Sequence, residues 1–349
     1  IMATDLLTNI ANALSQRFAS KLARQFNRMA VLAGALPAEA GFGKNVAWDV
    51  EFSGATAGSY AEGDDVSSGE FSVDTLVPAT LSWGHYRSAF QVSETEFDAA
   101  ATSAGSADAI IALFDERVMS AGSKLASVIN GDLWTGDGTD GSSNPNIVGV
   151  HGGALETSGT YAGIDRGTYT EWKGNVLANG GVARPLTVDL MDQLDANIFS
   201  ASGIRPNLIV VDPATFRKYK GLFESVRRIE GTGPIDRYDT STSELFYQGI
   251  PILRDKDAPS GTMTFLNTTK ISKVFLPISP MSSEDVFKTQ VVEGAGSNGE
   301  SESNETGLPF KIVPLAKTGD SLKFMVKSVL NLKVMRPNSM GYIKDISVA

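Results

Sequence analysis

The chain has 349 residues, of which 42% are hydrophobic, and this is enough apolar material for a large packed core. Its formal net charge of −10 disfavours nucleic-acid binding as the main task, because phosphate recognition needs a basic surface. The sequence contains no cysteine and two histidines. It therefore excludes disulfides, thiolate nucleophiles, zinc–cysteine sites and iron–sulfur clusters, and it disfavours a metal site built from several histidines.

The first predicted element is an amphipathic helix over residues 5–33, where apolar residues recur at three- and four-residue spacing. A basic stripe on one face of this helix is either a solvated surface or a docking site for an acidic partner. Its members are Arg17, Lys21, Arg24 and Arg28. Residues 29–36 faintly resemble the end of a signal peptide, but they lie too far along the chain. No apolar run approaches the roughly 20 residues that a membrane span needs, so no membrane association is predicted.

Residues 46–92 are predicted to form a long β-hairpin, with a loop rich in glycine, serine and aspartate over 53–69. One stretch of this hairpin has seven acids and no base: Asp49, Glu51, Glu62, Asp64, Asp65, Glu70 and Asp74. Arg87 is the only basic residue in the hairpin. An extended hairpin of this kind is marginally stable alone, so we expect it to lie on another surface.

Two helices are predicted after the hairpin. Ser93 begins the first, with Glu96 three residues later in a capping box. The second is the strongest helix of the chain, because apolar residues hold one face over 107–130. Gly131 is expected to end it, at a length of about 36 Å.

The remainder of the chain mixes helices and strands without a repeated strand–helix unit, which favours an α+β fold. Thr187 and Gly203 are predicted to bound one helix, and Asp212-Pro213 to start another that runs through Tyr219. Strands are expected at 208–211, 250–254, 262–267, 271–276 and 322–335. In the last of these, the even-numbered apolar residues face one way, and the other face carries Lys323, Lys327, Asn331 and Lys333.

Motifs for cofactors and metals fail on their context. Residues 294–299 spell GxGxxG, but the acidic, non-helical residues that follow would repel a phosphate. Asp132, Asp137 and Asp140 lie in a glycine-rich stretch, yet no glutamate follows at the position that a helix–loop–helix calcium site needs. A looser calcium loop and an ordinary turn both remain open there.

No nucleophile elbow, zinc-protease motif or phosphate-binding loop occurs in the sequence. His85 lies in a predicted strand and His151 in a loop, and both are interpreted as structural residues. We therefore predict no catalytic residues, no cofactor and no metal, and a structural role becomes plausible.

Four segments, taken in this order, carry a resemblance to a known family. They are Arg166–Trp172 (RGTYTEW), Pro206–Tyr219 (PNLIVVDPATFRKY), Tyr247–Ile252 (YQGIPI) and Asn331–Gly341 (NLKVMRPNSMG). Together with the order of the predicted elements, they resemble the major capsid proteins of tailed bacteriophages, which have the Hong Kong 97-type fold.

The resemblance implies an α+β capsid fold with an N-arm over 1–42 and an extended E-loop hairpin over 43–92. A P-domain with a long spine helix would cover 93–180, an A-domain 181–320 with strands returning to the P-domain, and a C-terminal strand region 321–349. It also implies assembly of the chain with itself into pentamers and hexamers, in the host cytoplasm, to form the virion shell. Packaged DNA would be held without sequence-specific contacts.

Two departures shape the expected partners. The type member of the family joins a lysine of the E-loop to an asparagine of a neighbour, but this hairpin has no lysine, and Lys44 at its base is the nearest candidate. No long charged helical segment precedes the N-arm, so scaffold is expected to be a separate protein or already removed. A portal and decoration proteins are further expected partners.

The acidic hairpin is expected to meet basic residues of a neighbouring subunit. The basic stripe at Arg17–Arg28 is the first candidate, and Arg227 and Arg228 are the second. Three other functions remain open: an encapsulin-like compartment with the same fold, a secreted β-rich binding protein, and a hydrolase that uses His85 or His151.

Overall fold

The protein is described here by a computed structural model, which covers residues 31–53, 58–59, 62–63, 75–101, 106–139, 144–227, 245–276, 311–315 and 320–348. Its helices are α2 (Val31–Ala35), α3 (Glu94–Ala101), α4 (Ser106–Thr135), α5 (Val188–Ser202) and α6 (Pro213–Arg227). A π-helical turn η1 (Val150–Ala154) and two 3-10 turns, η2 (Thr170–Trp172) and η3 (Pro337–Ser339), accompany them.

The strands in the first half are β1 (Ala38–Ala40), β2 (Asn45–Ser53), β3 (Thr75–Ser82), β4 (Gly84–Ser93), β5 (Asp137–Thr139), β6 (Pro145–Val148), β7 (Thr160–Tyr161), β8 (Ile164–Asp165) and β9 (Asn175–Leu177). Those in the second half are β10 (Leu208–Val211), β11 (Leu245–Tyr247), β12 (Ile250–Arg254), β13 (Met263–Leu266), β14 (Ile271–Phe275), β15 (Lys311–Pro314), β16 (Ser321–Val334) and β17 (Gly341–Ile343).

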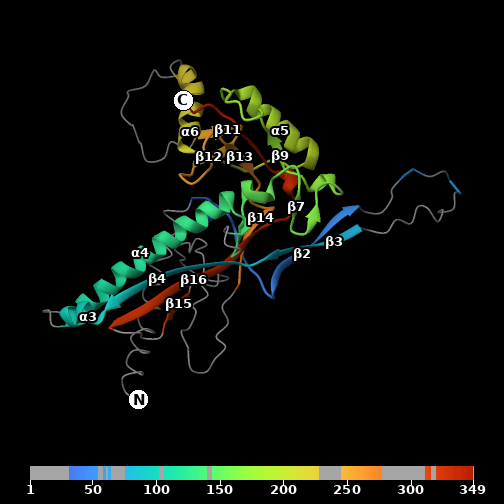
Figure 1. Ribbon diagram of the computed structural model, residues 1–349. Helices are drawn as coiled ribbons and strands as arrows, with labels where there is room; N and C mark the ends of the chain where they lie inside the picture. The colour runs from blue at the N-terminus through green and yellow to red at the C-terminus, as the bar shows by residue number, and fades with distance from the viewer. Residues whose placement is uncertain are drawn as a thin grey trace, which may run out of the picture.

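A long lobe is built on β16, the 14-residue strand that organises a five-stranded sheet. β4 pairs antiparallel with one edge of β16 over ten residue pairs, while β15 and β14 pair with successive parts of its other edge. Figure 1 shows helix α4 lying along this sheet, with α3 at the far end. Alternation therefore places one face of β4 and β16 against α4 and turns the other face away.

α4 runs five residues beyond the predicted end at residue 130, to Thr135, because Gly131 does not end the helix. Leu133 and Trp134 follow Gly131 and are fully buried. Their burial outweighs the roughly 1 kcal/mol that glycine costs inside a helix. The helix instead ends at Thr135, just before Gly136, where a Cβ would collide with the carbonyl oxygen of Ile147.

The predicted hairpin is confirmed for β2 and β3 but is wrong for its last third. β2 and β3 pair antiparallel, from Asn45 opposite Ser82 to Ser53 opposite Thr75. Residues 84–93 leave the hairpin after Trp83 and join β16 in the long lobe. The reason is the ten-pair register with β16, which buries Tyr86 and Val92 against the body of the subunit.

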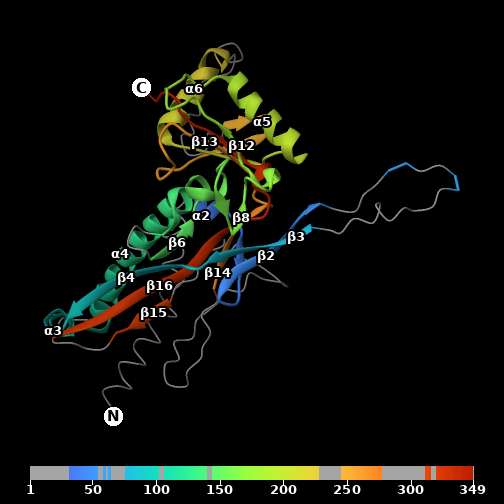
Figure 2. The same cartoon turned by 45° about the vertical axis from the view of Figure 1, so that its right-hand side comes forward.

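A compact lobe contains a six-stranded mixed sheet in the order β11-β12-β10-β13-β17-β9, with α5 and α6 beside it (Figure 2). The predicted boundaries of α5 are confirmed: the Thr187 hydroxyl accepts a hydrogen bond from Leu190 N at 3.2 Å, and Gly203 caps the helix at φ 70°. α6 starts at Pro213 as predicted but runs on past Tyr219 to Arg227.

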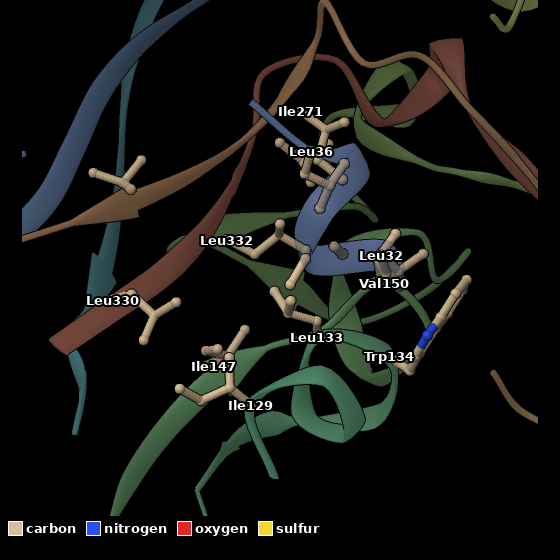
Figure 3. Close-up of a cluster of buried hydrophobic side chains, with 14 of the residues drawn as sticks. Leu32, Leu36, Ile129, Leu133, Trp134, Ile147, Val150, Ile271, Leu330 and Leu332 are labelled. Atoms are coloured by element: carbon tan, nitrogen blue, oxygen red, sulfur yellow. The ribbon is translucent and has the colours of Figure 1, made fainter. Parts of the chain in front are cut away.

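The main core joins α4, β16 and the short segment around α2. Leu32 of α2 and Leu36 just after it are at most 1% exposed and lie among side chains from α4, β6, β14 and β16, as Figure 3 shows. A second core lies between α5, α6 and the six-stranded sheet. The segment that leads out of the N-terminal region is thus an integral part of the long lobe.

Candidate assembly interface

The hairpin of β2 and β3 has two chemically different faces. On β2, the apolar residues that face the body are more buried than the exposed residues between them, which include Asp49 and Glu51. Opposite these two acids on β3 lie Pro78 and Leu76, and Leu76 is 63% exposed. The outer face of the hairpin is therefore acidic with one large apolar side chain.

The inner face of the hairpin is held to the body by aromatic contacts. Phe52 stacks on Tyr169 with ring centroids 4.2 Å apart and meets Trp172 edge-on at 5.8 Å. Trp48 lies 6.4 Å from the ring of Tyr161. Such pairs contribute about 1 kcal/mol each beyond the area they bury. They fix the position of the hairpin root, by which we mean the described residues of β2 and β3, against the body.

The body side of this contact is a loop around Arg166, which is 1% exposed. Its guanidinium donates to the carbonyl oxygens of Trp172 (3.1 Å), Ser158 (3.2 Å) and Ala154 (2.9 Å), and also to that of Gly153. The guanidinium carbon lies 5.6 Å from the ring centroid of Tyr161. The Arg166 guanidinium thus holds the turns of this loop together beneath the aromatic rings.

Burial lowers the pKa of Arg166 because the charged form loses water, and burial raises the pKa of the Tyr161 hydroxyl for the same reason. Both groups keep their ordinary forms at neutral pH, and the carbonyl oxygens satisfy the guanidinium. The sequence signalled this residue only through the resemblance of the RGTYTEW segment. Its carbonyl partners are backbone atoms that no residue pattern reveals.

A second buried polar centre joins three elements at Asp255. Its carboxylate accepts hydrogen bonds from Leu32 N (3.1 Å) of α2, and from Asn130 Nδ2 (3.0 Å) and Trp134 Nε1 (3.1 Å) of α4. Asp255 itself follows β12 in the compact lobe and is fully buried. One carboxylate therefore ties the N-terminal segment and the long helix to the compact lobe, and the sequence did not single it out.

Lys273 holds the same segment from the other side. Its side chain is fully buried and its ammonium donates to the carbonyl oxygen of Ala33. Burial lowers the pKa of Lys273 to about 8. β1 pairs with β14 in parallel, and Lys333 forms an ion pair with Glu39 of β1 at 3.1 Å.

Of the predicted interface residues, Glu51 lies on the exposed face of β2, and Glu62 is exposed in a turn. The structure places Glu51 beside Asp49, as the alternation predicted. Eight other residues lie outside the described part of the chain: Arg17, Lys21, Arg24, Arg28, Asp64, Asp65, Glu70 and Asp74. Arg228 lies outside it as well.

The two histidines occupy different surroundings. His85 is exposed on β4, whereas His151 lies in η1 rather than in a loop, with its ring stacked on Tyr342 at 4.1 Å. His151 Nε2 is 2.8 Å from the hydroxyl of Thr264. Burial lowers its pKa to about 3, so the ring is neutral and joins the two lobes.

The candidate calcium aspartates have protein partners. Asp132 accepts a hydrogen bond from the Tyr86 hydroxyl at 2.7 Å, and Asp137 accepts one from Thr139 N. Asp140 and the GxGxxG segment fall outside the described residues. Among those that are described, no three histidine or acidic side chains gather where they could hold a metal ion. None of the described helices is long and apolar enough to cross a membrane.

An open pocket of about 450 Å³ lies beside α5, lined by Asp192, Asp195, Ala196, Phe199, Arg205 and Gln248. Arg205 pairs with Asp195 at 2.7 Å, and the amide of Gln248 donates to Asp192 at 3.0 Å. Two carboxylates and one guanidinium therefore line the pocket, and each has a hydrogen-bonding partner. They form no nucleophile–base pair of the kind that catalysis requires.

One polar residue of β16 is buried. Asn331 was predicted on the face opposite the even-numbered apolar residues, and it is 1% exposed. Its amide donates to Ser82 O at 2.6 Å, and its side-chain oxygen accepts from Val148 N at 3.1 Å. The root of the hairpin covers this end of the sheet, and Asn331 supplies the hydrogen bonds that the burial demands.

Comparison with solved structures places this arrangement in a known fold. The chain is 20% identical to a chain of the cyanophage A-1(L) capsid asymmetric unit, with a TM-score of 0.67 over 91% of this chain and 93% of that chain. The capsid of Myoviridae phage XM1 gives 10% identity and a TM-score of 0.53 over 90% and 91%. The holo-SrpI encapsulin complex of Synechococcus elongatus PCC 7942 gives 10% and 0.52 over 92% and 88%.

These likenesses and the mixed topology define a Hong Kong 97-like capsid fold of the α+β type. The family described as SU10 major capsid protein matches residues 57–296, which is more than half of the chain, and the chain belongs to this family. It is a phage major capsid protein, a structural component of the virion shell and not an enzyme. No curated protein sequence matches the chain.

Proposed function

We propose that the subunit assembles into pentamers and hexamers that tile an icosahedral or elongated shell around double-stranded DNA. The observation that carries this proposal is the hairpin. Among the described residues, β2 and β3 pair only with each other and extend away from the body. Its inner face packs on the body of its own subunit through Trp48 and Phe52, but its outer face, with Asp49, Glu51 and Leu76, is exposed, and a neighbouring subunit would cover that face.

The subunit is proposed to divide as the family resemblance implies. The N-arm takes 1–42, the E-loop 43–92, the P-domain with α4 as spine helix 93–180, the A-domain 181–320, and the C-terminal strand region 321–349. The long lobe would be the P-domain completed by β4, by the returning strands β14 and β15 and by β16, and the compact lobe would be the rest of the A-domain with β9 and β17. Because β4 pairs with β16, the part of the E-loop able to reach a neighbour is the stretch between β2 and β3.

The hairpin is proposed to hold its neighbour by charge complementarity and not by a covalent bond. Its acids at Glu51, Glu62, Asp64, Asp65, Glu70 and Asp74 would face a basic surface. Arg17, Lys21, Arg24 and Arg28 of the adjacent N-arm are one such surface, and Arg227 with Arg228 is another. The hairpin contains no lysine that could form a covalent cross-link to an asparagine of a neighbour. Many modest non-covalent contacts, repeated over a closed lattice, would stabilise the shell collectively.

Other partners follow from the same proposal. A scaffolding protein, a portal at one vertex and decoration proteins on the outer surface are the proposed partners. Assembly takes place in the bacterial cytoplasm. DNA is enclosed without sequence-specific contacts, since a chain with a net charge of −10 offers little phosphate-binding surface overall.

Electron microscopy of the purified protein, alone and co-produced with its neighbouring genes, tests this proposal. We expect closed shells with five- and six-fold capsomers, which package DNA when terminase and portal are present. Shells that instead enclose a protein cargo would favour the encapsulin-like alternative. A protein that stays monomeric under all conditions would contradict assembly.

The role of the N-arm has its own test. Reversal of all four charges, Arg17→Glu, Lys21→Glu, Arg24→Glu and Arg28→Glu, should abolish regular shells if the hairpin meets this stripe. Normal shells from that variant would rule out the contact between the hairpin and this stripe, but they would not contradict the capsid function.

A further inference from the structure

An exposed turn between β9 and α5 carries an asparagine followed by glycine. In residues 179–182 (NGGV), Val182 N donates to Asn179 O at 3.1 Å, and Gly180 and Gly181 have φ of 63° and 81°. Positive φ at both central residues is the signature of a type I′ turn. All four residues are exposed. The carboxamide of Asn179 therefore lies next to a backbone N–H that no side chain shields from water.

The backbone nitrogen of Gly180 is available for reaction. Among the described residues no acceptor takes a hydrogen bond from it, whereas the N–H groups of Asn179 and Gly181 on either side both donate to Asp345. The space around Gly180 is open as well, since a Cβ there would meet no atom within 4 Å. Asn179 Nδ2 donates to Val182 O at 2.7 Å, which keeps the carboxamide over the turn. A nucleophile and an electrophilic carbon thus share one small, hydrated element.

The turn also holds a carboxylate. Asn179 N and Gly181 N donate to Oδ2 of Asp345 at 2.7 and 3.1 Å. These backbone hydrogen bonds lower the pKa of Asp345, so the group is ionised at neutral pH. A new carboxylate on residue 179 would therefore face a like charge.

The loop that contains the turn holds the end of the compact lobe in place. We call residues 344–347 the C-terminal segment. Lys344 N donates to Leu177 O at 3.1 Å, before the turn, and Arg184 N donates to Asp345 O at 2.8 Å, after it. A change in the path of the turn would disturb both of these backbone hydrogen bonds.

A second pair of the same composition provides an internal comparison. The sequence has three Asn-Gly pairs, and the third, at residues 298–299, lies outside the described residues. Asn130 is fully buried in α4, and its Nδ2 donates to both carboxylate oxygens of Asp255 and to Asp257. Gly131 follows inside the helix, where a backbone N–H is bonded to the preceding turn. The fold therefore locks one pair and leaves the other exposed.

We propose that Asn179 is a site of spontaneous deamidation and that the reaction releases the C-terminal segment from the turn. Base removes the proton of Gly180 N, this nitrogen bonds to Asn179 Cγ, and the carboxamide nitrogen takes up a proton and leaves as ammonia. Water then opens the cyclic imide. Cleavage of the ring bond to Cγ gives aspartate, and cleavage of the ring bond to the backbone carbonyl carbon gives isoaspartate. Water is the only co-reactant.

Both products weaken the turn. The donor to Val182 O is lost with the ammonia, and the new carboxylate repels Asp345. In isoaspartate the main chain runs through the former side chain and is longer, which moves Gly181 N away from Asp345. The inference goes beyond the proposed function, because the reaction takes place in a single subunit and does not depend on assembly.

Peptide mass spectrometry of the unassembled subunit, after incubation in mildly alkaline buffer, tests the reaction. The peptide with Asn179 should exchange NH for O in mass and separate into an aspartyl and an isoaspartyl form, at a rate that rises with pH. The peptide with Asn130 should react at least about tenfold more slowly, because α4 must first open there. An Asn179 peptide that reacts no faster than the Asn130 peptide would overturn the proposal.

Asn179→Gln is the matched variant for the reacting group. Glutamine keeps a carboxamide but has to close a larger and slower ring, so the mass change in this peptide should disappear. A mass change that persists at the original rate would place the reaction at another residue and refute the assignment to Asn179.

Asn179→Asp tests the consequence, because it installs one product directly. Hydrogen exchange at Lys344 and Ile346 should become about tenfold faster than in the unchanged protein. Gln193→Glu, on the exposed face of α5, adds the same charge nearby and should leave this exchange unchanged. Equal exchange in Asn179→Asp and in the control would rule out release of the C-terminal segment.

Discussion

Two arginines of this subunit have opposite surroundings. Arg166 is 1% exposed and has carbonyl oxygens around its guanidinium, while Arg87 is exposed on a strand opposite another cation. The first has all its partners within the chain, and the second has none among the described carboxylates. The contrast teaches that charge serves two tasks here: internal charges stabilise the subunit, and unbalanced surface charges are available for its neighbours.

The largest effect on the internal side is expected from Arg166→Met. This change strands several buried carbonyl oxygens and loosens the loop that supports the hairpin root. We expect a loss of about 4 kcal/mol in the free energy of unfolding. Chemical denaturation measures it, and Arg217→Met on the exposed face of α6 is the control, expected within about 0.5 kcal/mol of the unchanged protein. A loss as small as that of the control would show that Arg166 is replaceable.

Asp255→Asn should come next. The substitution keeps the shape but puts an amide donor where Leu32 N, Asn130 and Trp134 all donate. We expect about 2–3 kcal/mol of destabilisation, together with faster hydrogen exchange at Leu32 and Ala33. Unchanged exchange in α2 would mean that the carboxylate does not hold this segment in place.

Lys273 provides a pH test of how the same N-terminal segment is held in place. Its pKa is lowered to about 8 in the folded protein, below the ordinary 10.5, so the unfolded chain binds more protons between these values. Stability of the natural protein relative to Lys273→Met should therefore rise with pH from about 8 to about 10.5. The rise should be about 3 kcal/mol. A difference between the two proteins that stays flat over this pH range would contradict the burial of a charged ammonium at Lys273.

Phe52→Leu is expected to have the smallest effect. It removes the stacking on Tyr169 and the edge contact with Trp172 but keeps an apolar side chain. The loss should be about 1 kcal/mol, with increased hydrogen exchange confined to β2 and β3. Increased exchange throughout the long lobe would show that the aromatic root supports more than the hairpin.

The elements that depend on local signals were predicted well from the sequence. The capping box at Ser93 and Glu96 forms both of its hydrogen bonds, and α5 begins and ends at its predicted caps. The alternation on β2 predicted which residues face outward. These features depend on neighbours in the chain, so a single sequence contains them.

What the sequence did not show depends on distant partners. Gly131 was wrongly predicted to end α4 because the burial of Trp134 comes from other elements. The departure of β4 to β16 requires a pairing across more than 200 residues. Asp255 likewise accepts from donors of α2 and α4 that lie 121 to 223 residues away in the chain, whereas the partners of Arg166 lie within 13 residues but are backbone carbonyl oxygens.

The single residue between β3 and β4 has a mechanical consequence. Trp83 is buried and donates from its indole to Gly43 O at 3.1 Å, so the hairpin strand and the sheet strand are joined with no slack. If neighbours pull on the hairpin as contents press the shell outward, the tension runs along β4. The ten pairs between β4 and β16 would then be loaded in shear, all at once, because their hydrogen bonds stand across the direction of pull. A ladder loaded this way resists far more force than one opened pair by pair.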